Sequence, residues 1–566
     1  METVRRPPSP PARPPTPAKG KAAPAKQQKL VGPRAFKLLW DTHSVTGIVI
    51  GLGLFVIFYA GAYALYRGEL HAWADPAMRV AEAGVTVDEA VAPLFAERPP
   101  AQGTDVQVNL PFRERAYYSV RYRTPVGDTT EAVTATLSLE TGEVIAEDGR
   151  GFRSDLSEIL YKLHFFGQAG FWGELVAGFI AVFFLLAVAS GILIHLRKLP
   201  KDWHTFRPRG KLRDALADAH TVLGLIGLPF AAMYAISGAF LALLIILLAP
   251  TVLVVFGGDL EAIDPIVNGY EMPPHEPTGE AAEMLSFAEY VEALPASWEG
   301  TVAPTFMSVH GWGDQAGIVQ VFGEAASSLT AGPQAILQAT TGEVLAANNP
   351  TRGTALGGTT AALVNLHYGR MGPGTPVAKV LYFFLALATA AVILTGNILW
   401  VLVRRPKDPR ATPKLHRFLA RLTVGVGCGL AVAVPVLFLT TAALPIELPS
   451  LKTWENVALF GAWGALTVAA FAGPSAVWAA RWQLGLAGAL SLLVPPAGGA
   501  LGGMWIWTAA ASGLWGLVTV DVGFLLMGPA LLWTARRLRP DALAPALAGD
   551  GATAEAAPAG PIPAPS

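Results

Sequence analysis

The stretch Asp41-Thr42-His43-Ser44-Val45-Thr46-Gly47 returns later in the chain, with substitutions, as Asp218-Ala219-His220-Thr221-Val222-Leu223-Gly224. Both copies stand where a long apolar run begins, and in both a glycine (Gly61, Gly238) follows the histidine at the same spacing. The repeat therefore indicates an internal duplication, and the duplicated part includes histidines at the ends of apolar helices.

A second pair of histidines is repeated in the same way. Leu163-His164 and Leu366-His367 each follow a more polar segment, which closes with Thr-Gly-Glu-Val-(Ile/Leu)-Ala at 141–146 and again at 341–346. The duplicated unit is thus an apolar helix, a polar segment and a second apolar helix. Residues 405–540 lie outside this repeat.

The composition is that of a membrane protein. Of the 566 residues, 52% are apolar and only 15% are charged, whereas soluble domains contain about 25% charged residues. Because a run of about 20 apolar residues suffices to cross a bilayer, we expect an all-α, multi-pass bundle of about eight transmembrane helices in the lipid bilayer. They are expected at 40–66, 172–196, 218–250, 377–403, 418–444, 456–480, 483–503 and 511–535.

Lysines and arginines crowd before the first run, between the second and third, between the fourth and fifth, and after the eighth. Cytoplasmic loops are enriched in these residues, so both termini are expected in the cytoplasm and the two long polar segments outside it. The expected parts are 1–35 (disordered tail), 36–69 (first transmembrane helix), 70–162 (first exterior domain), 163–250 (second and third transmembrane helices), 251–365 (second exterior domain), 366–404 (fourth transmembrane helix), 405–540 (fifth to eighth transmembrane helices) and 541–566 (disordered tail).

The two exterior segments predict a pair of small α+β domains. Alternation of apolar and polar residues, with Thr-Gly turns, is typical of strands. The first segment is expected to hold a helix at 85–95 and strands at 105–110, 116–123, 131–139 and 143–146; the second, a helix near 282–294 and strands near 317–322 and 335–339.

The repeated histidines predict a cofactor held between helices. His43 and His220 fall near the cytoplasmic ends of their helices, and His164 and His367 near the exterior ends. Neutral imidazole is a common axial ligand of haem iron, and facing helices commonly build cofactor sites. The single cysteine, Cys428, excludes a Cys-x-x-Cys-His haem attachment and an iron–sulfur cluster held by this chain alone. Two b-type haems, each held by two histidines, are therefore expected.

Glycine-rich breaks follow His164 and His367, so each should lie on a short interfacial helix folded over the bundle. Gly61 and Gly238 should let a helix lie close to a flat macrocycle. A lone interfacial histidine is more often a polar residue without a cofactor, but two repeated pairs favour ligands.

His195 and His416 are expected at about the depth of His43 and His220, and the repeat does not predict them. Trp400 occupies the place that matches His195. His195 is favoured as a haem-propionate partner or structural residue; a replacement ligand, or half of a third haem site with His416, stays open. The remaining histidines (His71, His204, His275, His310) are expected to be surface residues.

Acidic residues near the helices have simpler expected roles. Asp41 and Asp218 should cap the starts of their helices. Asp521, inside the last apolar run, is a candidate for a polar contact or proton site.

The stretch 163–197, ending in Ser190-Gly191-Ile192-Leu193-Ile194-His195-Leu196-Arg197, resembles the PepSY-associated transmembrane-helix family of bacterial inner-membrane proteins. The resemblance continues through Asp202-Trp203-His204-Thr205-Phe206-Arg207-Pro208, 218–230 and Leu366-His367, and covers 35–420 well. Similar sequences often carry a histidine directly after Phe230, where this chain has alanine.

The resemblance implies periplasmic PepSY-like domains in the two exterior segments. It also implies a haem-dependent reductase that takes electrons from the cytoplasmic side and reduces ferric siderophores in the periplasm, with His43, His220, His164 and His367 as haem-iron ligands. No residue of the chain is assigned as a catalytic acid, base or nucleophile. No Gly-x-Gly-x-x-Gly element follows a strand and opens a helix, so the electron donor is expected to be a separate protein, a quinol or a soluble reductant. No nucleic-acid partner is expected. The competing expectations are a non-catalytic ligand-binding or regulatory protein, and, less favoured, a transporter.

Overall fold

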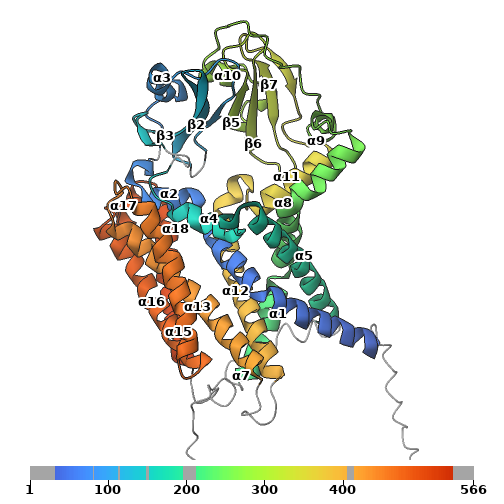
Figure 1. The fold of residues 1–566 in the computed structure, drawn as a ribbon, viewed down its shortest axis with the longest axis vertical. Helices are drawn as coiled ribbons and strands as arrows, with labels where there is room; N and C mark the ends of the chain where they lie inside the picture. The colour runs from blue at the N-terminus through green and yellow to red at the C-terminus, as the bar shows by residue number, and fades with distance from the viewer. Residues whose placement is uncertain are drawn as a thin grey trace, which may run out of the picture.

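The computed structural model describes residues 32–80, 82–112, 115–147, 152–195, 212–404 and 413–538. A helical part forms the lower two-thirds of the molecule, and a single β-sheet forms a dome above it (Figure 1). The expected tails 1–35 and 541–566 lie outside the described residues except for 32–35, as do His204 and most of the basic residues of the two inner basic clusters.

Within the described residues, seven helices are long and apolar enough to cross a membrane, and a bent pair makes up to eight. This agrees with a multi-pass membrane bundle. The helices of the repeat are α1 (Pro33–Ala64), α5 (Gly170–His195), α7 (Leu212–Ile226), α8 (Leu228–Val255) and α12 (Thr375–Val403). Those that follow are α13 (Lys414–Ala443), α14 (Leu451–Asn456), η7 (Val457–Gly461), α15 (Ala462–Ala472), α16 (Ala476–Ala500), α17 (Ile506–Ala511) and α18 (Trp515–Arg537).

The expected third span, 218–250, is not one straight helix. Its two pieces, Arg213–Ile226 and Leu228–Leu244, meet at Gly227 with a bend of 69°. Pro229 lies in the first turn of α8, where its missing N–H costs no helical hydrogen bond. The bend therefore falls at a Gly-x-Pro sequence, which the apolar run by itself does not reveal.

The expected helix caps were also misplaced. Helix α1 begins at Pro33 with Gly32 as its N-cap residue, so Asp41 lies inside the helix. Asp218 likewise lies inside α7 and is buried. Proline in the first turn is the sequence signal for an earlier start.

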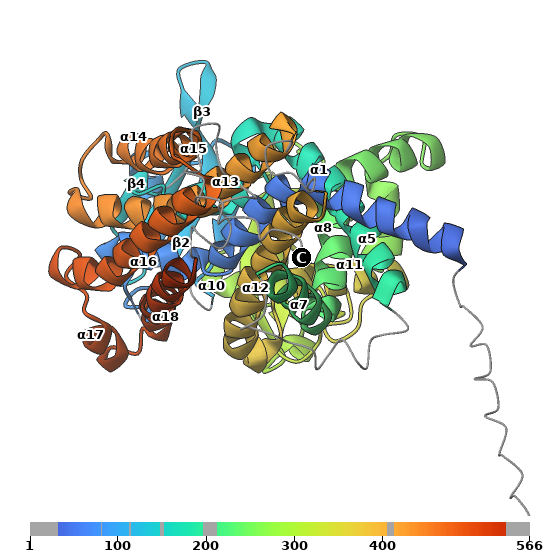
Figure 2. The ribbon, with the colours of Figure 1, turned by 90° about the horizontal axis from the view of Figure 1, so that it is seen from below.

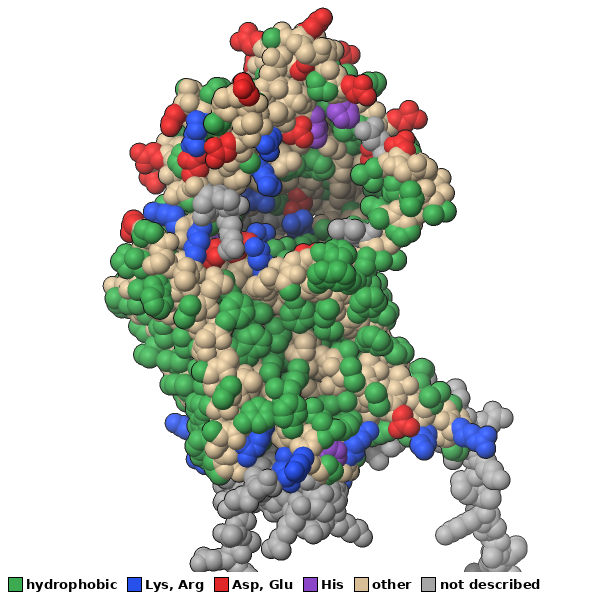
Figure 3. Space-filling model, viewed as in Figure 1, with side chains coloured by type: hydrophobic (Ala, Val, Ile, Leu, Met, Phe, Trp, Pro, Cys, Tyr) green, Lys and Arg blue, Asp and Glu red, His purple; other side chains and the backbone are tan. Residues whose placement is uncertain are grey.

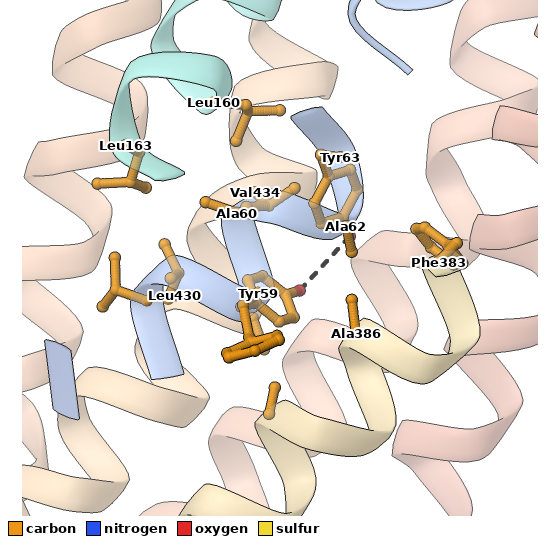
Figure 4. Packing of buried hydrophobic residues seen from close by; sticks show 14 of the residues in the cluster. Tyr59, Ala60, Ala62, Tyr63, Leu160, Leu163, Phe383, Ala386, Leu430 and Val434 are labelled. Atoms are coloured by element: carbon orange, nitrogen blue, oxygen red, sulfur yellow. Dashed lines mark hydrogen bonds between the residues drawn. The ribbon is translucent and has the colours of Figure 1, made fainter. Parts of the chain in front are cut away.

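Helices α1, α5, α7–α8 and α12 form one bundle, and α13–α18 form a second group beside it (Figure 2). A core of buried side chains joins the two. Tyr59 and Tyr63 of α1 are linked by their hydroxyl groups at 3.5 Å, and they lie among side chains of α12 and α13, including Phe383 and Val434 (Figure 4). The second group is thus packed against the repeat and is not a loose appendage.

The dome is one antiparallel eight-stranded sheet in the order β4-β3-β2-β1-β5-β6-β7-β8. Strands β1 and β5 pair directly, with Val108 opposite Met307, so the two expected exterior domains share a continuous sheet. The strands predicted for the second exterior segment did not include β5 and β8. The strands are β1 (Val106–Asn109), β2 (Tyr117–Val126), β3 (Thr129–Ser138), β4 (Val144–Glu147), β5 (Val302–His310), β6 (Ile318–Ala325), β7 (Gln334–Gln338) and β8 (Val344–Ala347).

The upper face of the sheet is apolar and is covered by two short helices, α3 (Val87–Glu97) and α10 (Phe287–Glu292). Both helices begin with a capping box, Thr86 with Glu89 and Ser286 with Glu289. The repeat is therefore visible in the folded dome as well as in the sequence. The opposite face of the sheet is polar and faces the helical part.

Short helices connect the sheet to the bundle. Helices α4 (Leu156–His164) and α11 (Ala355–His367) each end at a histidine, and each is followed by a 3-10 turn, η2 (Gly167–Ala169) and η5 (Gly372–Gly374). The prediction of short histidine-bearing helices before the true spans is confirmed. Also at this level are α2 (Arg67–Ala74), η1 (Pro76–Met78), η3 (Glu261–Ile263) and α9 (Asp264–Val267). The short η4 (Ala296–Trp298) follows α10, and its Trp298 belongs to the core of the dome.

Candidate cofactor site

The bundle has two ends, named here by their residues. The basic side is the end where Lys and Arg side chains gather below the apolar surface (Figure 3), and Arg213 and Arg404 line the cavity there. The sheet side is the opposite end, beneath the dome. Apolar side chains cover the surface between them. An apolar belt between a basic rim and a polar dome is typical of a protein that sits in a bilayer.

On the basic side, His43 of α1 and His220 of α7 come together, with ring centroids 6.2 Å apart. Each ring is fixed by the neighbouring helix of its own repeat. The Nδ1 atom of His43 lies 2.9 Å from the carbonyl oxygen of Ala187, and that of His220 lies 2.9 Å from the carbonyl oxygen of Val392. A carbonyl only accepts, so Nδ1 is the protonated nitrogen in both rings and Nε2 keeps its lone pair.

On the sheet side, His164 and His367 form the second pair, with ring centroids 5.9 Å apart. The Nδ1 atom of His164 lies 2.8 Å from the carbonyl oxygen of Ile57, whereas Nδ1 of His367 lies 2.9 Å from the hydroxyl oxygen of Ser237. Burial lowers the pKa of His164, and burial together with the charge of His164 lowers the pKa of His367 to about 3. Both imidazoles are therefore neutral at physiological pH.

The geometry of both pairs fits a metal held between two imidazoles. With metal–nitrogen bonds of roughly 2 Å, two rings on opposite sides of one metal have centroids roughly 6 Å apart. Histidine ligands usually donate their second ring N–H to a carbonyl or carboxylate, which fixes the ring and its tautomer. Three of the four histidines have a backbone carbonyl as this partner, and His367 has the hydroxyl oxygen of Ser237 instead.

Each pair also lines an apolar cavity. The cavity around His43 and His220 has a volume of about 420 Å³, and that around His164 and His367 about 260 Å³. Leu54 and Phe184 line both cavities, so the two cavities adjoin. Largely apolar cavities of this order are typical of cofactor sites, and the residues present therefore fit haem.

Two glycines lie close against histidine rings. A Cβ atom at Gly61 would lie 2.6 Å from Nδ1 of His164, and one at Gly396 would lie 2.9 Å from Cε1 of His220. Gly61 and Gly396 therefore allow a neighbouring imidazole to reach the backbone. The close approach of a macrocycle to Gly61 and Gly238 stays a prediction. At Gly238 the nearest atom of His367 would be 3.9 Å away, which is ordinary contact.

The two unrepeated histidines have different positions. His195 lines the cavity on the basic side together with Arg213 and Arg404, which agrees with a place beside a cofactor's polar edge. The ring of His416 packs against Trp400, with centroids 5.2 Å apart, and His416 does not line that cavity. A third haem site shared by His195 and His416 stays a prediction.

Sequence reasoning placed His71 on the surface, and this was wrong. His71 lies on α2, is buried, and stacks on Phe152 with centroids 3.8 Å apart. Its Nε2 lies 3.5 Å from Oε1 of Glu158. Asp521, by contrast, does make the predicted polar contact, because it accepts a hydrogen bond of 3.2 Å from the indole nitrogen of Trp73.

Sequence reasoning also missed a large chamber between the dome and the bundle. Its volume is about 910 Å³, and the polar face of the sheet forms its roof. Tyr161, Tyr368, Ala64 and Leu65 line both this chamber and the cavity of His164 and His367. A thin layer of side chains therefore separates the chamber from the sheet-side histidine pair. The chamber's residues come from distant segments, so no local pattern could reveal it.

The comparisons with known proteins agree with this architecture. The family described as PepSY-associated TM region matches residues 40–402, which include all four repeated histidines. An uncharacterized protein of Pseudomonas aeruginosa is 28% identical over 353 residues, which cover 58% of this chain and 84% of that protein.

Proposed function

Since this chain belongs to the family of PepSY-associated TM regions, we propose that it is an oxidoreductase of the bacterial inner membrane. In this proposal it holds two b-type haems and reduces ferric chelates, siderophores among them, on the sheet side. The observation that carries the proposal is the doubled histidine pair, with centroid separations of 6.2 and 5.9 Å and a hydrogen-bonded Nδ1 on every ring.

His43 and His220 would hold one haem, and His164 and His367 the other. Bound in this way, haem supplies reversible one-electron redox chemistry. The chain's own residues hold each Nδ1 atom against an oxygen atom and line both cavities with apolar walls that exclude water. Phe58 and Phe184 pack edge to face at 5.3 Å between the pairs and keep this region dry.

The chamber beneath the sheet supplies a place for the electron acceptor. A ferric chelate that takes up one electron there becomes a ferrous chelate. The lower charge of the iron weakens its attraction to oxygen ligands, so the metal is released more readily. The electron has to come from a donor on the basic side: a quinol, a separate reductase protein or a soluble reductant. The basic rim supports placing that side in the cytoplasm.

The absorption spectrum of the purified chain tests the proposal. Protein made with an adequate haem supply should show reduced Soret and α bands of low-spin haem b, with about two haems per chain by the pyridine hemochromogen method. Chemically reduced protein should then convert a ferric chelate to Fe(II), captured by a ferrous-specific dye. Protein without haem would contradict the proposal and favour a non-catalytic ligand-binding role.

Substitution of single histidines locates the two sites. His164→Ala or His367→Ala should remove the sheet-side haem and leave about one haem per chain, and ferric reduction should stop. His43→Ala should remove the other haem. His275→Ala is a matched control, because His275 lies in the dome, where its Nδ1 is 3.0 Å from the carbonyl oxygen of Pro273 and its ring is 5.8 Å from that of His310. Unchanged haem content in all of these variants would refute the ligand assignment.

A further inference from the structure

The charge of the chamber beneath the sheet points to a particular class of ligand. Five basic side chains line it, Arg67, Arg115, Arg121, Arg370 and Lys379, and the acidic residue among the described lining residues is Glu324. Basic side chains gather around the corresponding hollow in Figure 3. The chamber wall is therefore strongly cationic in the described part of the chain.

Two of these basic side chains form ion pairs with acidic residues that do not line the chamber. Arg67 contacts Glu158 at 2.5 Å, and Lys379 contacts Glu69 at 2.5 Å. Burial by itself would raise the pKa of Glu158, but His71 and Arg67 outweigh burial and hold this pKa at about 2. Glu158 therefore stays ionised and offsets Arg67, and these pairs contribute little net charge to the chamber.

The other three guanidinium groups give the chamber its net charge. Among the described residues, no acid forms an ion pair with Arg115, Arg121 or Arg370. The Nη1 of Arg115 donates hydrogen bonds to Oδ1 of Asn109 at 3.2 Å and to the carbonyl oxygens of Leu110 and Thr305 at 3.3 Å each. These neutral acceptors orient the group without cancelling its charge.

The positive charges of the chamber also repel one another. Burial lowers the pKa of Arg115, and the nearby charges of Arg370 and Arg67 lower it further. Arg370 and Arg67 in turn lie over the rings of Tyr368 and Tyr161, at 4.9 and 4.2 Å from the ring centroids. Those two tyrosines separate the chamber from the cavity of His164 and His367. A bound anion would relieve the repulsion between the guanidinium groups directly above the histidine pair.

We propose that the chamber selects ferric chelates of net negative charge, whose carboxylate or other acidic oxygens are bound by Arg115, Arg121 and Arg370. Planar guanidinium groups pair with carboxylates through two parallel N–H···O bonds, which gives orientation as well as affinity. Neutral and cationic chelates lack these partners and are bound more weakly. That the bound chelate is reduced rests on the proposed function; that it is bound does not.

Gallium(III) complexes separate binding from reduction, because Ga(III) imitates Fe(III) in size and charge and is not reduced. Equilibrium dialysis of the full-length protein in nanodiscs with radioactive gallium would compare the anionic citrate complex with the cationic desferrioxamine B complex. The citrate complex should bind at least roughly tenfold more tightly, and its affinity should fall as salt rises. Equal or tighter binding of the cationic complex would overturn the proposal.

Arg121→Gln provides the second test. Arg121 is an exposed residue of β2 in the chamber roof, so its loss should leave the fold intact and weaken citrate-complex binding by roughly tenfold. Arg123→Gln is the matched control, since Arg123 stands on the same strand but hydrogen bonds to Thr130 and does not line the chamber. Unchanged affinity in Arg121→Gln, or salt-independent binding by the wild-type chain, would refute the proposal. A haem-free protein that still prefers the anionic complex would refute only the reductase function.

Discussion

Gly61 of α1 lies directly against the imidazole of His164, so closely that a Cβ atom at position 61 would come within 2.6 Å of Nδ1. The same nitrogen lies 2.8 Å from the carbonyl oxygen of Ile57, one turn earlier on α1. The glycine and the carbonyl together bring the ring onto the helix backbone. The position of this proposed haem ligand thus depends on a residue without a side chain.

Gly61→Ala should therefore displace His164. The contact cannot be relieved by moving a flexible chain end, so overpacking should cost about 1–3 kcal/mol, and haem content should fall to about one per chain. Gly238→Ala is the matched control, because its Cβ would lie 3.9 Å from His367 and alanine favours helix by about 1 kcal/mol. Thermal unfolding and pyridine hemochromogen assays check both variants. Equal effects at the two glycines would contradict the packing argument.

His367 differs from the other three histidines because its Nδ1 partner is a side chain, Ser237. Ser237→Ala should remove the hydrogen bond, loosen the ring and weaken binding of the sheet-side haem by about 10–100-fold. Redox titration should also show a shifted midpoint potential for that haem alone.

Ser190→Ala is the control for Ser237→Ala. Ser190 also precedes a glycine, but its hydroxyl donates to the carbonyl oxygens of Leu186 and Ala187. The Ala187 carbonyl also holds Nδ1 of His43, so Ser190→Ala should leave the sheet-side haem unchanged. A shift of the same size in Ser190→Ala, or no shift in Ser237→Ala, would show that the serine does not position His367.

The duplication allowed the two histidine pairs to be predicted from sequence, because each copy repeats both the histidine and its distance from an apolar run. The ring separations of 6.2 and 5.9 Å agree with that pairing. The short helices were predictable for a local reason, since glycine-rich breaks follow His164 and His367. Whether the pairs bind haem stays a prediction.

Long-range pairing could not be predicted in the same way. Strands β1 and β5 join the two halves of the sheet, but they are far apart in the sequence, and local alternation carries no information on partners. Pro304 also stands within β5, and proline inside a run argues against a strand. The register shifts between Pro304 and Phe306, which accommodates it. The chamber depends on this joined sheet and was missed for the same reason.

The positions of His195 and His416 predict different effects of removing them. His195→Ala should keep about two haems per chain but change the spectrum or potential of the haem on the basic side, because His195 lines that cavity with Arg213. His416→Ala should leave both haems unchanged, since the ring of His416 packs against Trp400 and does not itself line the cavity on the basic side. Loss of a haem in His416→Ala, measured by pyridine hemochromogen, would show that it is a ligand after all.

The buried ion pair of Glu69 and Lys379 is expected to fasten α2 to α12 and α18. Glu69 of α2 and Lys379 of α12 are both buried, and the Cγ of Glu69 lies against Gly516 of α18, so three parts of the chain meet at this pair. Removing one partner leaves the other charge buried without its counter-ion, which costs about 3–5 kcal/mol. Glu69→Gln and Lys379→Met should each lower the unfolding temperature strongly in detergent.

The double variant Glu69→Gln/Lys379→Met leaves no buried charge at this point. Replacing a buried pair by uncharged residues is often neutral, so the double variant should recover most of the stability lost in either single one. The coupling energy from this double-mutant cycle should be large and favourable, as expected for residues in contact. Additive losses would mean that the two side chains act independently, and the pair would then not fasten α2 to α12 and α18.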